Sequence, residues 1–307
     1  MSYFQILKAG ILTTMQDLGR FGYGDIGISS SGAMDEEAFL WANRLLHNEP
    51  NSNMLEITYG NFELLSFGST IFCITGAKAD IWLNNKLIEP YRCYKINRGD
   101  KLKIGFVKRG VRLYFAIKGA FLDTKELGSY SVSLKESIKS PLKNGDRVYF
   151  KPSSSPLLGY LPKQFIPPLT THLELRVLLG YEYQAFAKEA LEHFFNSTFK
   201  VHSHSRMGYR LKGALIESNL EIISNPISFG AIQITKSGEP IILLKERQTI
   251  GGYPKIGSVI APDCFKLAQL KEGDTISFRA ISLQEASEVT KQFYQQFINS
   301  NFKETTK

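Results

Sequence analysis

Two glycine-rich segments carry most of the side chains whose types and spacing suit chemistry. The first holds Gln16, Asp17 and Arg20 among five glycines between positions 10 and 27, and the second reads ERQTIGGYP over residues 246–254. Glycine lets the backbone turn sharply or approach a ligand closely. Arginine binds carboxylates or phosphates through two parallel hydrogen bonds. The combination is typical of a site for a small anionic molecule.

Arginines recur in these segments and in a third one, SRMGYRLKG, over residues 205–213. The four of interest are Arg20, Arg206, Arg210 and Arg247. If they converge on one cleft, they suit a small anionic substrate or a phosphorylated intermediate. The alternative is that each pairs with a nearby acid, such as Asp17 or Glu246, and only holds its loop. The residues alone leave both interpretations open.

The sequence gives less support to a metal site, a standard nucleotide-binding loop or a nucleophilic serine. His202 and His204 would lie on one face of a strand, as two metal ligands must, but no third ligand is evident. The sequence has three cysteines, Cys73, Cys93 and Cys264, which is an odd number, and no CxxC spacing. We therefore expect reduced, mostly buried thiols and no cysteine metal site. The sequence has neither a G-x-x-x-x-G-K-[ST] loop nor a G-x-S-x-G elbow. Any ATP site must therefore be built otherwise or shared with another chain.

Short strands must position these segments. GAIQIT (230–235) and IILL (241–244) predict a hairpin that feeds the second glycine-rich loop, and residues 53–150 read as one short strand after another. A polar residue, Gly and Asp precede a strand three times, at 98–100, 144–146 and 272–274. Helical periodicity is confined to Met34–His47, Tyr183–Phe195 and Ser282–Phe302. The pattern predicts a mainly β protein of barrels or sandwiches.

Length and composition limit the classes of protein to which the chain can belong. The chain has 307 residues, with 43% hydrophobic and 21% charged residues, as is ordinary for a globular protein of two domains. The stretch from Pro152 to Pro168 contains five prolines, so we predict domains at 1–152 and 169–307 with a linker at 153–168. The net charge of +8 comes from scattered lysines, which does not favour nucleic-acid binding. No apolar run approaches the ~18 residues of a membrane span and no signal peptide is evident, so we expect a cytoplasmic protein that does not contact membranes.

Several segments together resemble a known family. ERQTIGGYP is similar to its [DE]-[RA]-Q-T-T-G-G-Y-P segment, and residues 10–39 are similar to its opening segment; further matches are NRLLHN (43–48), ITGA (74–77), LRVLLG (175–180) and SRMGYRLKG (205–213). The family is that of allophanate hydrolase subunit 2, which includes the C subunit of 5-oxoprolinase and the carboxyltransferase domain of urea carboxylase. The matches follow the family's order over most of the chain. Departures are GSYSV at 128–132 in place of G-S-R-S-T, Ala120 in place of Gly, Glu246 in place of Asp, and Ile250 in place of Thr.

The resemblance implies a fold and three functions. It implies two tandem cyclophilin-like β-barrel domains with a few short helices and a C-terminal helix. The first function is that of one component of an ATP-dependent 5-oxoprolinase, a hydrolase that opens 5-oxo-L-proline to L-glutamate together with homologues of the A and B subunits, the latter similar to allophanate hydrolase subunit 1. The second is biotin-dependent carboxyl transfer, with biotin supplied by a partner because this chain has no Met-Lys-Met attachment site. The third is a non-catalytic regulatory partner of a kinase-inhibitor homologue.

We predict one shared site from these features. The expected catalytic residues are Asp17, Arg20, Glu246 and Arg247, with a carboxylate as general base and the arginines neutralising developing negative charge. The expected substrate-binding residues are Gln16, Arg206, Arg210, Gln233, Gln248, Thr249, Gly251, Gly252 and Tyr253. Because ligand sites favour domain junctions, we expect the first glycine-rich loop to face the second half of the chain across a groove between the barrels.

Overall fold

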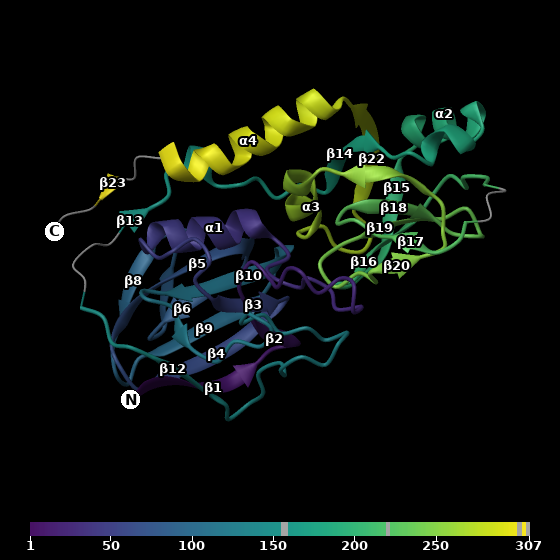
Figure 1. Cartoon of the computed structure of the whole chain (residues 1–307). Helices are drawn as coiled ribbons and strands as arrows, with labels where there is room; N and C mark the ends of the chain where they lie inside the picture. Colours follow the sequence, from purple (N-terminus) through teal and green to yellow (C-terminus); the bar gives the residue numbers. More distant parts are fainter. Residues whose placement is uncertain (155–158, 219–221, 300–302, 305–307) are drawn as a thin grey trace. The chain divides into compact units, whose positions relative to one another are not determined.

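The computed structural model describes residues 1–154, 159–218, 222–299 and 303–304, and these residues divide into two compact units. The first unit comprises Met1–Arg20, Ser31–Leu169 and Phe297–Lys307, and the second comprises Phe21–Ser30 and Thr170–Gln296. The predicted linker at 153–168 includes residues 155–158, which lie outside the described residues. Figure 1 shows the elements of each unit.

The first unit is built from two antiparallel sheets (Figure 1). The seven-stranded sheet runs in the order β11 (Phe121–Leu122), β12 (Arg147–Phe150), β1 (Ser2–Ala9), β4 (Gly60–Ser66), β9 (Lys101–Phe106), β6 (Ile81–Leu83) and β7 (Lys86–Ile88). The five-stranded sheet runs in the order β2 (Leu12–Gln16), β3 (Met54–Thr58), β10 (Arg109–Ile117), β5 (Thr70–Lys78) and β8 (Cys93–Ile96). A separate pair joins β13 (Gly159–Tyr160) to β23 (Lys303–Glu304).

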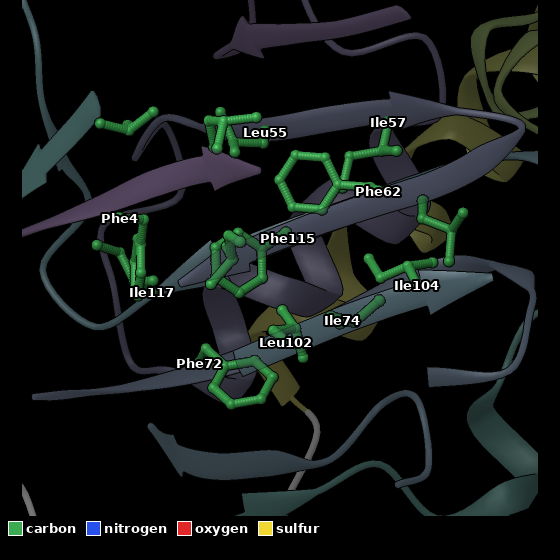
Figure 2. Close-up of a cluster of buried hydrophobic side chains, with 14 of the residues drawn as sticks. Phe4, Leu55, Ile57, Phe62, Phe72, Ile74, Leu102, Ile104, Phe115 and Ile117 are labelled. Atoms are coloured by element: carbon green, nitrogen blue, oxygen red, sulfur yellow. The ribbon is translucent and has the colours of Figure 1, made fainter. Parts of the chain in front are cut away.

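Apolar side chains from both sheets form the core of the first unit (Figure 2). Strand β4 shows the expected alternation, with Phe62 and Leu64 fully buried and their neighbours half-buried. Strand β10 is buried on both faces, because Phe115 points into the core whereas Tyr114 lies beneath a helix. Alternating residues of one strand therefore serve two layers.

Helix α1 (Glu36–Leu45) packs on β5 and β10 of the five-stranded sheet (Figure 1). The side chain of Asp35 caps it by accepting from the Ala38 amide at 3.0 Å. The Thr75 hydroxyl donates to the Ala38 carbonyl at 2.7 Å. The thiols of Cys73 and Cys93 reach carbonyls further along the helix. The predicted helix at 34–47 is confirmed with slightly shorter bounds, and all three cysteines are free and buried as expected.

The second unit is a closed seven-stranded barrel (Figure 1). Its order is β14 (His172–Leu179), β21 (Lys255–Val259), β18 (Ala231–Ile234), β19 (Pro240–Leu243), β16 (Gly208–Lys212), β15 (Phe199–His204) and β22 (Thr275–Ile281). The parallel pairing of β14 with β22 closes it. A short ladder joins β17 (Asn225–Pro226) to β20 (Ile250–Gly251). The mainly β fold and the predicted hairpin of β18 with β19 are confirmed.

The remaining helices of the described residues are α2 (Lys188–Asn196) and α3 (Ala261–Leu267) in the second unit and α4 (Leu283–Asn299), which belongs to the second unit up to Gln296. The helix predicted at 183–195 is interrupted, because Phe186 and Ala187 are extended between a 3₁₀ turn, η2 (Tyr183–Ala185), and α2. Another 3₁₀ turn is η1 (Lys163–Phe165) in the first unit. The Ser282 hydroxyl caps α4 by accepting from the Glu285 amide at 3.1 Å, and residues 300–302 of the predicted helix lie outside the described residues. No helix among the described residues is long and apolar enough to cross a membrane.

The three predicted Gly-Asp turns share one geometry. Gly99, Gly145 and Gly273 have φ values of 92°, 93° and 93°, a conformation that favours glycine. The aspartate after each glycine accepts from the main-chain amide three positions before it, at 2.7, 2.7 and 3.0 Å. Each turn also exchanges two main-chain hydrogen bonds with a neighbouring segment. The same local device therefore starts β9 and β12 in the first unit and β22 in the second.

Core packing makes a first prediction about stability. Replacing Phe115, which is fully buried, by Ala should destabilise the first unit by about 3–5 kcal/mol, through lost burial and the cavity left behind. Both tryptophans of the chain, Trp41 and Trp82, lie in this unit, so tryptophan fluorescence during urea unfolding reports on it. The control is Leu87→Ala, at a side chain 61% exposed, which should change stability by at most ~0.5 kcal/mol. Equal losses in the two variants would contradict this view of the core.

Candidate functional site

The second unit contains a pocket of ≈ 170 Å³ against its barrel. Strands β15, β16, β18 and β19 and the loop after β19 contribute to its lining. Its polar side chains include Ser203, Arg210, Gln233, Gln248 and Tyr253. Four of these were predicted as substrate-binding residues, and the fold brings them together from positions far apart in the sequence.

Three polar side chains of the pocket have hydrogen-bonding groups without a partner among the described residues: those of Arg210, Gln233 and Gln248. Arg210 is exposed, and its guanidinium makes no ion pair or hydrogen bond within the described residues. Gln233 is only 1% exposed, yet its Nε2 has no partner among them. Gln248 is half-buried and likewise has no hydrogen bond there. A buried amide donor without a partner is costly, so Gln233 is suited to a ligand or water that accepts a hydrogen bond.

Gly251 lets the loop backbone pack closely against the two glutamines. A Cβ at this position would lie 3.0 Å from Nε2 of Gln233, 3.3 Å from Nε2 of Gln248 and 2.6 Å from a methyl group of Ile227. The distance to the methyl group is too short for any contact, and the two distances to nitrogen are tight. Both amide nitrogens therefore lie against the same backbone position, which only glycine can occupy without displacing its neighbours.

A buried ion pair holds the start of this loop. Arg206 donates through Nε to Oε1 of Glu246, with both side chains at most 4% exposed, and the Glu246 amide donates back to the Arg206 carbonyl at 2.9 Å. Leu244 and Met207 add another main-chain hydrogen bond beside it. For Arg206 the structure thus supports the interpretation that the arginine pairs with an acid and holds its loop.

Arg247 anchors the middle of the loop. Its Nε donates to the Ile227 carbonyl at 3.0 Å and its Nη1 to the Leu244 carbonyl at 3.2 Å. Burial lowers the pKa of this guanidinium. The Thr249 carbonyl accepts from the Ile227 amide at 2.9 Å, so both residues tie the loop to the segment before β18. Gly252 and Tyr253 follow, and both border a second hollow of ≈ 320 Å³.

Glu182 holds the far end of the loop. Its carboxylate accepts from the Lys255 amide at 2.7 Å and lies 2.9 Å from the Lys255 Nζ. Burial disfavours the charged carboxylate, but hydrogen bonds from Lys255 and Tyr181 and the charge of Lys255 outweigh it, so the pKa of Glu182 is lowered. Sequence reasoning missed this pair, since Glu182 lies far from the loop along the chain.

A second polar cluster surrounds Asp17 in the first unit. One oxygen of this buried carboxylate accepts from the Gly19 amide at 2.8 Å and from the hydroxyls of Ser129 and Ser131 at 2.6 Å each; the other accepts from the Tyr130 amide at 2.9 Å. Four protein donors therefore engage this carboxylate, three of them on one oxygen. This geometry favours a positioning role for Asp17 over a general-base role. The GSYSV segment, noted above for its missing arginine, is therefore the partner of the first loop.

Gln16 and Arg20 complete this cluster. The Gln16 amide donates from Nε2 to the Thr14 hydroxyl at 3.0 Å and to the Val132 carbonyl at 3.1 Å, while its buried Oε1 has no partner among the described residues. Arg20 is 2% exposed and donates to the Ser131 carbonyl. Each predicted cluster thus forms within its own unit, and the expected groove between the two halves stays a prediction.

The two histidines do not form the expected pair. Strand β15 has an irregularity between Val201 and Ser203, which interrupts the alternation of side chains. His202 borders a hollow beside Lys200, whereas His204 borders the pocket of Arg210 and stacks on Tyr209 at 5.1 Å between ring centroids. The expectation that both imidazoles share one face is therefore wrong. No group of three potential metal ligands occurs in the described part of the chain.

The geometry defines a two-unit β protein with a small polar pocket, and comparison with known proteins supplies its class. The model of the carboxyltransferase domain, subdomain A and B, matches residues 26–280, so the chain belongs to this family. It is 36% identical to the C subunit of 5-oxoprolinase from Haemophilus influenzae over 93% of this chain and 94% of that protein, and 34% identical to the Escherichia coli protein of the same name over 92% of each. The resemblance inferred from the motifs is confirmed.

Solved structures agree with this assignment. The urea carboxylase of Kluyveromyces lactis superimposes with a TM-score of 0.89 at 29% identity, covering 97% of this chain and 29% of that one. The urea amidolyase of the same organism gives a TM-score of 0.88 and covers 97% of this chain and 20% of that one. The chain therefore has the fold of a part of these longer proteins.

The buried pair at the start of the loop leads to a second prediction. Replacing Arg206 by Ala should destabilise the second unit by about 3–5 kcal/mol, because the Glu246 carboxylate would stay buried without this partner. The double change R206M/E246L should recover much of that loss. The control is Arg279→Ala, at an exposed ion pair with Glu285, which should change the unfolding temperature little because solvent screens an exposed pair. Thermal unfolding followed by circular dichroism measures all four proteins; equal losses for Arg206 and Arg279 would contradict the bracing role.

The lowered pKa of Glu182 leads to a third prediction. A carboxylate with a lowered folded-state pKa stabilises the fold above its unfolded pKa, roughly 4.3, and loses that contribution as the pH falls through the folded value. Glu182→Gln should therefore be less stable than the parent at pH 7, and the difference should shrink below about pH 4. Unfolding temperatures of both proteins from pH 7 to pH 3 measure this. A difference that stays constant over the range would refute a stabilising ionised Glu182.

Proposed function

We propose that this chain is the C subunit of an ATP-dependent 5-oxoprolinase, acting with homologues of the A and B subunits to hydrolyse 5-oxo-L-proline to L-glutamate. The observation that carries the proposal is the match in length: the chain aligns with 94% of the H. influenzae 5-oxoprolinase protein but only 17% of the urea amidolyases. That relative is named as one subunit of its enzyme, which supports the expectation of partner chains.

The pocket does not fit ATP. At ≈ 170 Å³ it is smaller than the ~300–1,000 Å³ typical of sites for drug-sized ligands, and its charged lining consists of Arg210 beside neutral polar groups. The proposal therefore assigns nucleotide binding to a partner chain or to a site shared with one. This chain's own contribution is to bind and orient the small substrate.

The proposed roles of the charged residues follow from what they already contact. Asp17 and Arg20 organise the first loop around Ser131, and Arg206, Glu246 and Arg247 hold the second. We propose that Arg20 and Arg247 affect turnover through these loops, since their guanidinium groups donate to main-chain carbonyls. Loops held in this way are pre-organised for binding, which lowers the entropy lost when a ligand orders them.

Biotin-dependent carboxyl transfer is the second candidate. The family model is named for a carboxyltransferase domain, and the K. lactis urea carboxylase has the same fold over 97% of this chain. This function requires a biotinylated partner. Loss of activity on addition of avidin would favour it, whereas avidin should leave 5-oxoproline hydrolysis unchanged.

A reconstitution tests the primary proposal and supplies a fourth prediction. The three purified proteins should release glutamate from 5-oxo-L-proline only with ATP and only with this chain present. Arg247→Ala should lower kcat by ~10²-fold or more, the scale expected when a pre-organised donor arrangement is lost, and Arg247→Lys should restore part of it. Arg279→Ala is the matched control at an exposed arginine.

Several outcomes would contradict the proposal. Absence of ATP-dependent glutamate release above the level of the A and B homologues alone would overturn it. Binding of this chain to the B homologue without any turnover would favour a regulatory role instead. A drop in thermal stability for Arg247→Ala with unchanged kcat per folded molecule would limit this residue to supporting the fold.

A further inference from the structure

We infer that the pocket of the second unit recognises a small molecule carrying a carboxylate together with an amide whose N–H and C=O lie on the same edge. Arg210 would bind the carboxylate, and Gln233 and Gln248 would bind the amide. The inference deepens the proposed function, on which it rests, by naming the binding groups and the ligand class.

Gln233 has a buried donor without a partner among the described residues. Gln233 lies in β18, is 1% exposed and has an Nε2 without a hydrogen-bond partner in the described part of the chain. The same side chain borders the pocket. Because a buried amide N–H loses its water on folding, an acceptor oxygen from a ligand would restore the missing hydrogen bond.

Two carboxamides converge beside the pocket. The Nε2 atoms of Gln233 and Gln248 lie 3.0 and 3.3 Å from the point where a Cβ of residue 251 would stand, so both amides pack against the same glycine, and both side chains line the pocket. A glutamine carboxamide presents a donor and an acceptor side by side. A ring amide has its N–H and C=O on the same edge, so it can pair with Gln248 through two hydrogen bonds while its oxygen also accepts from Gln233.

Arg210 supplies the cation of the pocket. Arg210 borders the pocket and is exposed, and its guanidinium makes no ion pair or hydrogen bond within the described residues. Arg206, four residues earlier, is by contrast buried against Glu246. A guanidinium that is not used by the protein favours a ligand carboxylate, which it binds in a planar, bidentate arrangement.

The volume of the pocket limits the size of the ligand. A volume of ≈ 170 Å³ suits a ligand of a single small ring and excludes nucleotides and biotin from this hollow. A cyclic amide with an adjacent carboxylate meets all three conditions. Urea has the amide edge but no carboxylate, so it would use only the two glutamines.

Calorimetric titration of the full chain with four probes tests the inference and gives a fifth prediction. 5-Oxo-L-proline should bind. 2-Pyrrolidinone, which lacks the carboxylate, and L-proline, which lacks the ring carbonyl, should each bind roughly 10–100-fold more weakly, which is the range for one lost charge-assisted or buried hydrogen bond. Urea should bind no more tightly than 2-pyrrolidinone. Equal binding of 5-oxo-L-proline and L-proline would overturn the role of the two glutamines.

Substitutions locate the binding. Arg210→Gln should weaken 5-oxo-L-proline by roughly 10–100-fold and leave 2-pyrrolidinone unchanged. The matched control is Lys212→Gln, a cation on the same strand that borders a different hollow. Gln233→Leu and Gly251→Ala should weaken both ligands. Gln248→Ala, at a half-buried side chain, tests the amide if Gln233→Leu fails to fold.

The outcomes separate this inference from the proposed function. Turnover by the three-protein complex that is unaffected by Arg210→Gln and Gln248→Ala would overturn the inference and leave the function standing. Binding with the expected selectivity but without turnover in the complex would support the inference and contradict the function. Failure of 5-oxo-L-proline to bind either the chain alone or the complex would overturn the inference.

Discussion

A carboxylate removed from water has to be hydrogen-bonded or paired, and this constraint fixes both glycine-rich loops. In the first unit the Asp17 carboxylate collects four donors from its own loop and from the segment 129–131. In the second unit Glu246 pairs with Arg206 at one end of the loop and Glu182 with Lys255 at the other. Glycines make the loops pliable, and buried acids then select one conformation.

The barrel of the second unit supplies the rigid wall that the pocket needs. Arg210 and Gln233 stand on strands β16 and β18, each held on both sides by neighbouring strands. The loop after β19 adds Gln248 and Gly251 to that wall. Side chains on paired strands keep their positions better than side chains on free loops, so the cation and the amide are held at a constant separation.

The arginines near the second loop differ in whether their guanidinium groups contact other residues of the described chain. Arg206 and Arg247 are committed to a carboxylate and to main-chain carbonyls, while Arg210 makes no such contact among the described residues. In the sequence all three are arginines close to glycines and look alike. They differ in the groups that their guanidiniums contact, which only the folded chain shows.

The sequence by itself determined the mainly β class, the hairpin before the second loop, the three Gly-Asp turns and the family, because these depend on short-range patterns of glycine, aspartate and alternating apolar residues. It did not reveal the partners of Asp17, the Glu182 and Lys255 pair, the interrupted helix near Phe186 or the separation of His202 from His204. Those depend on which distant segments meet and where a strand bulges. Only the tertiary structure decided that one arginine of four, Arg210, stands with two glutamines at an open pocket, because burial and pairing are properties of the folded chain.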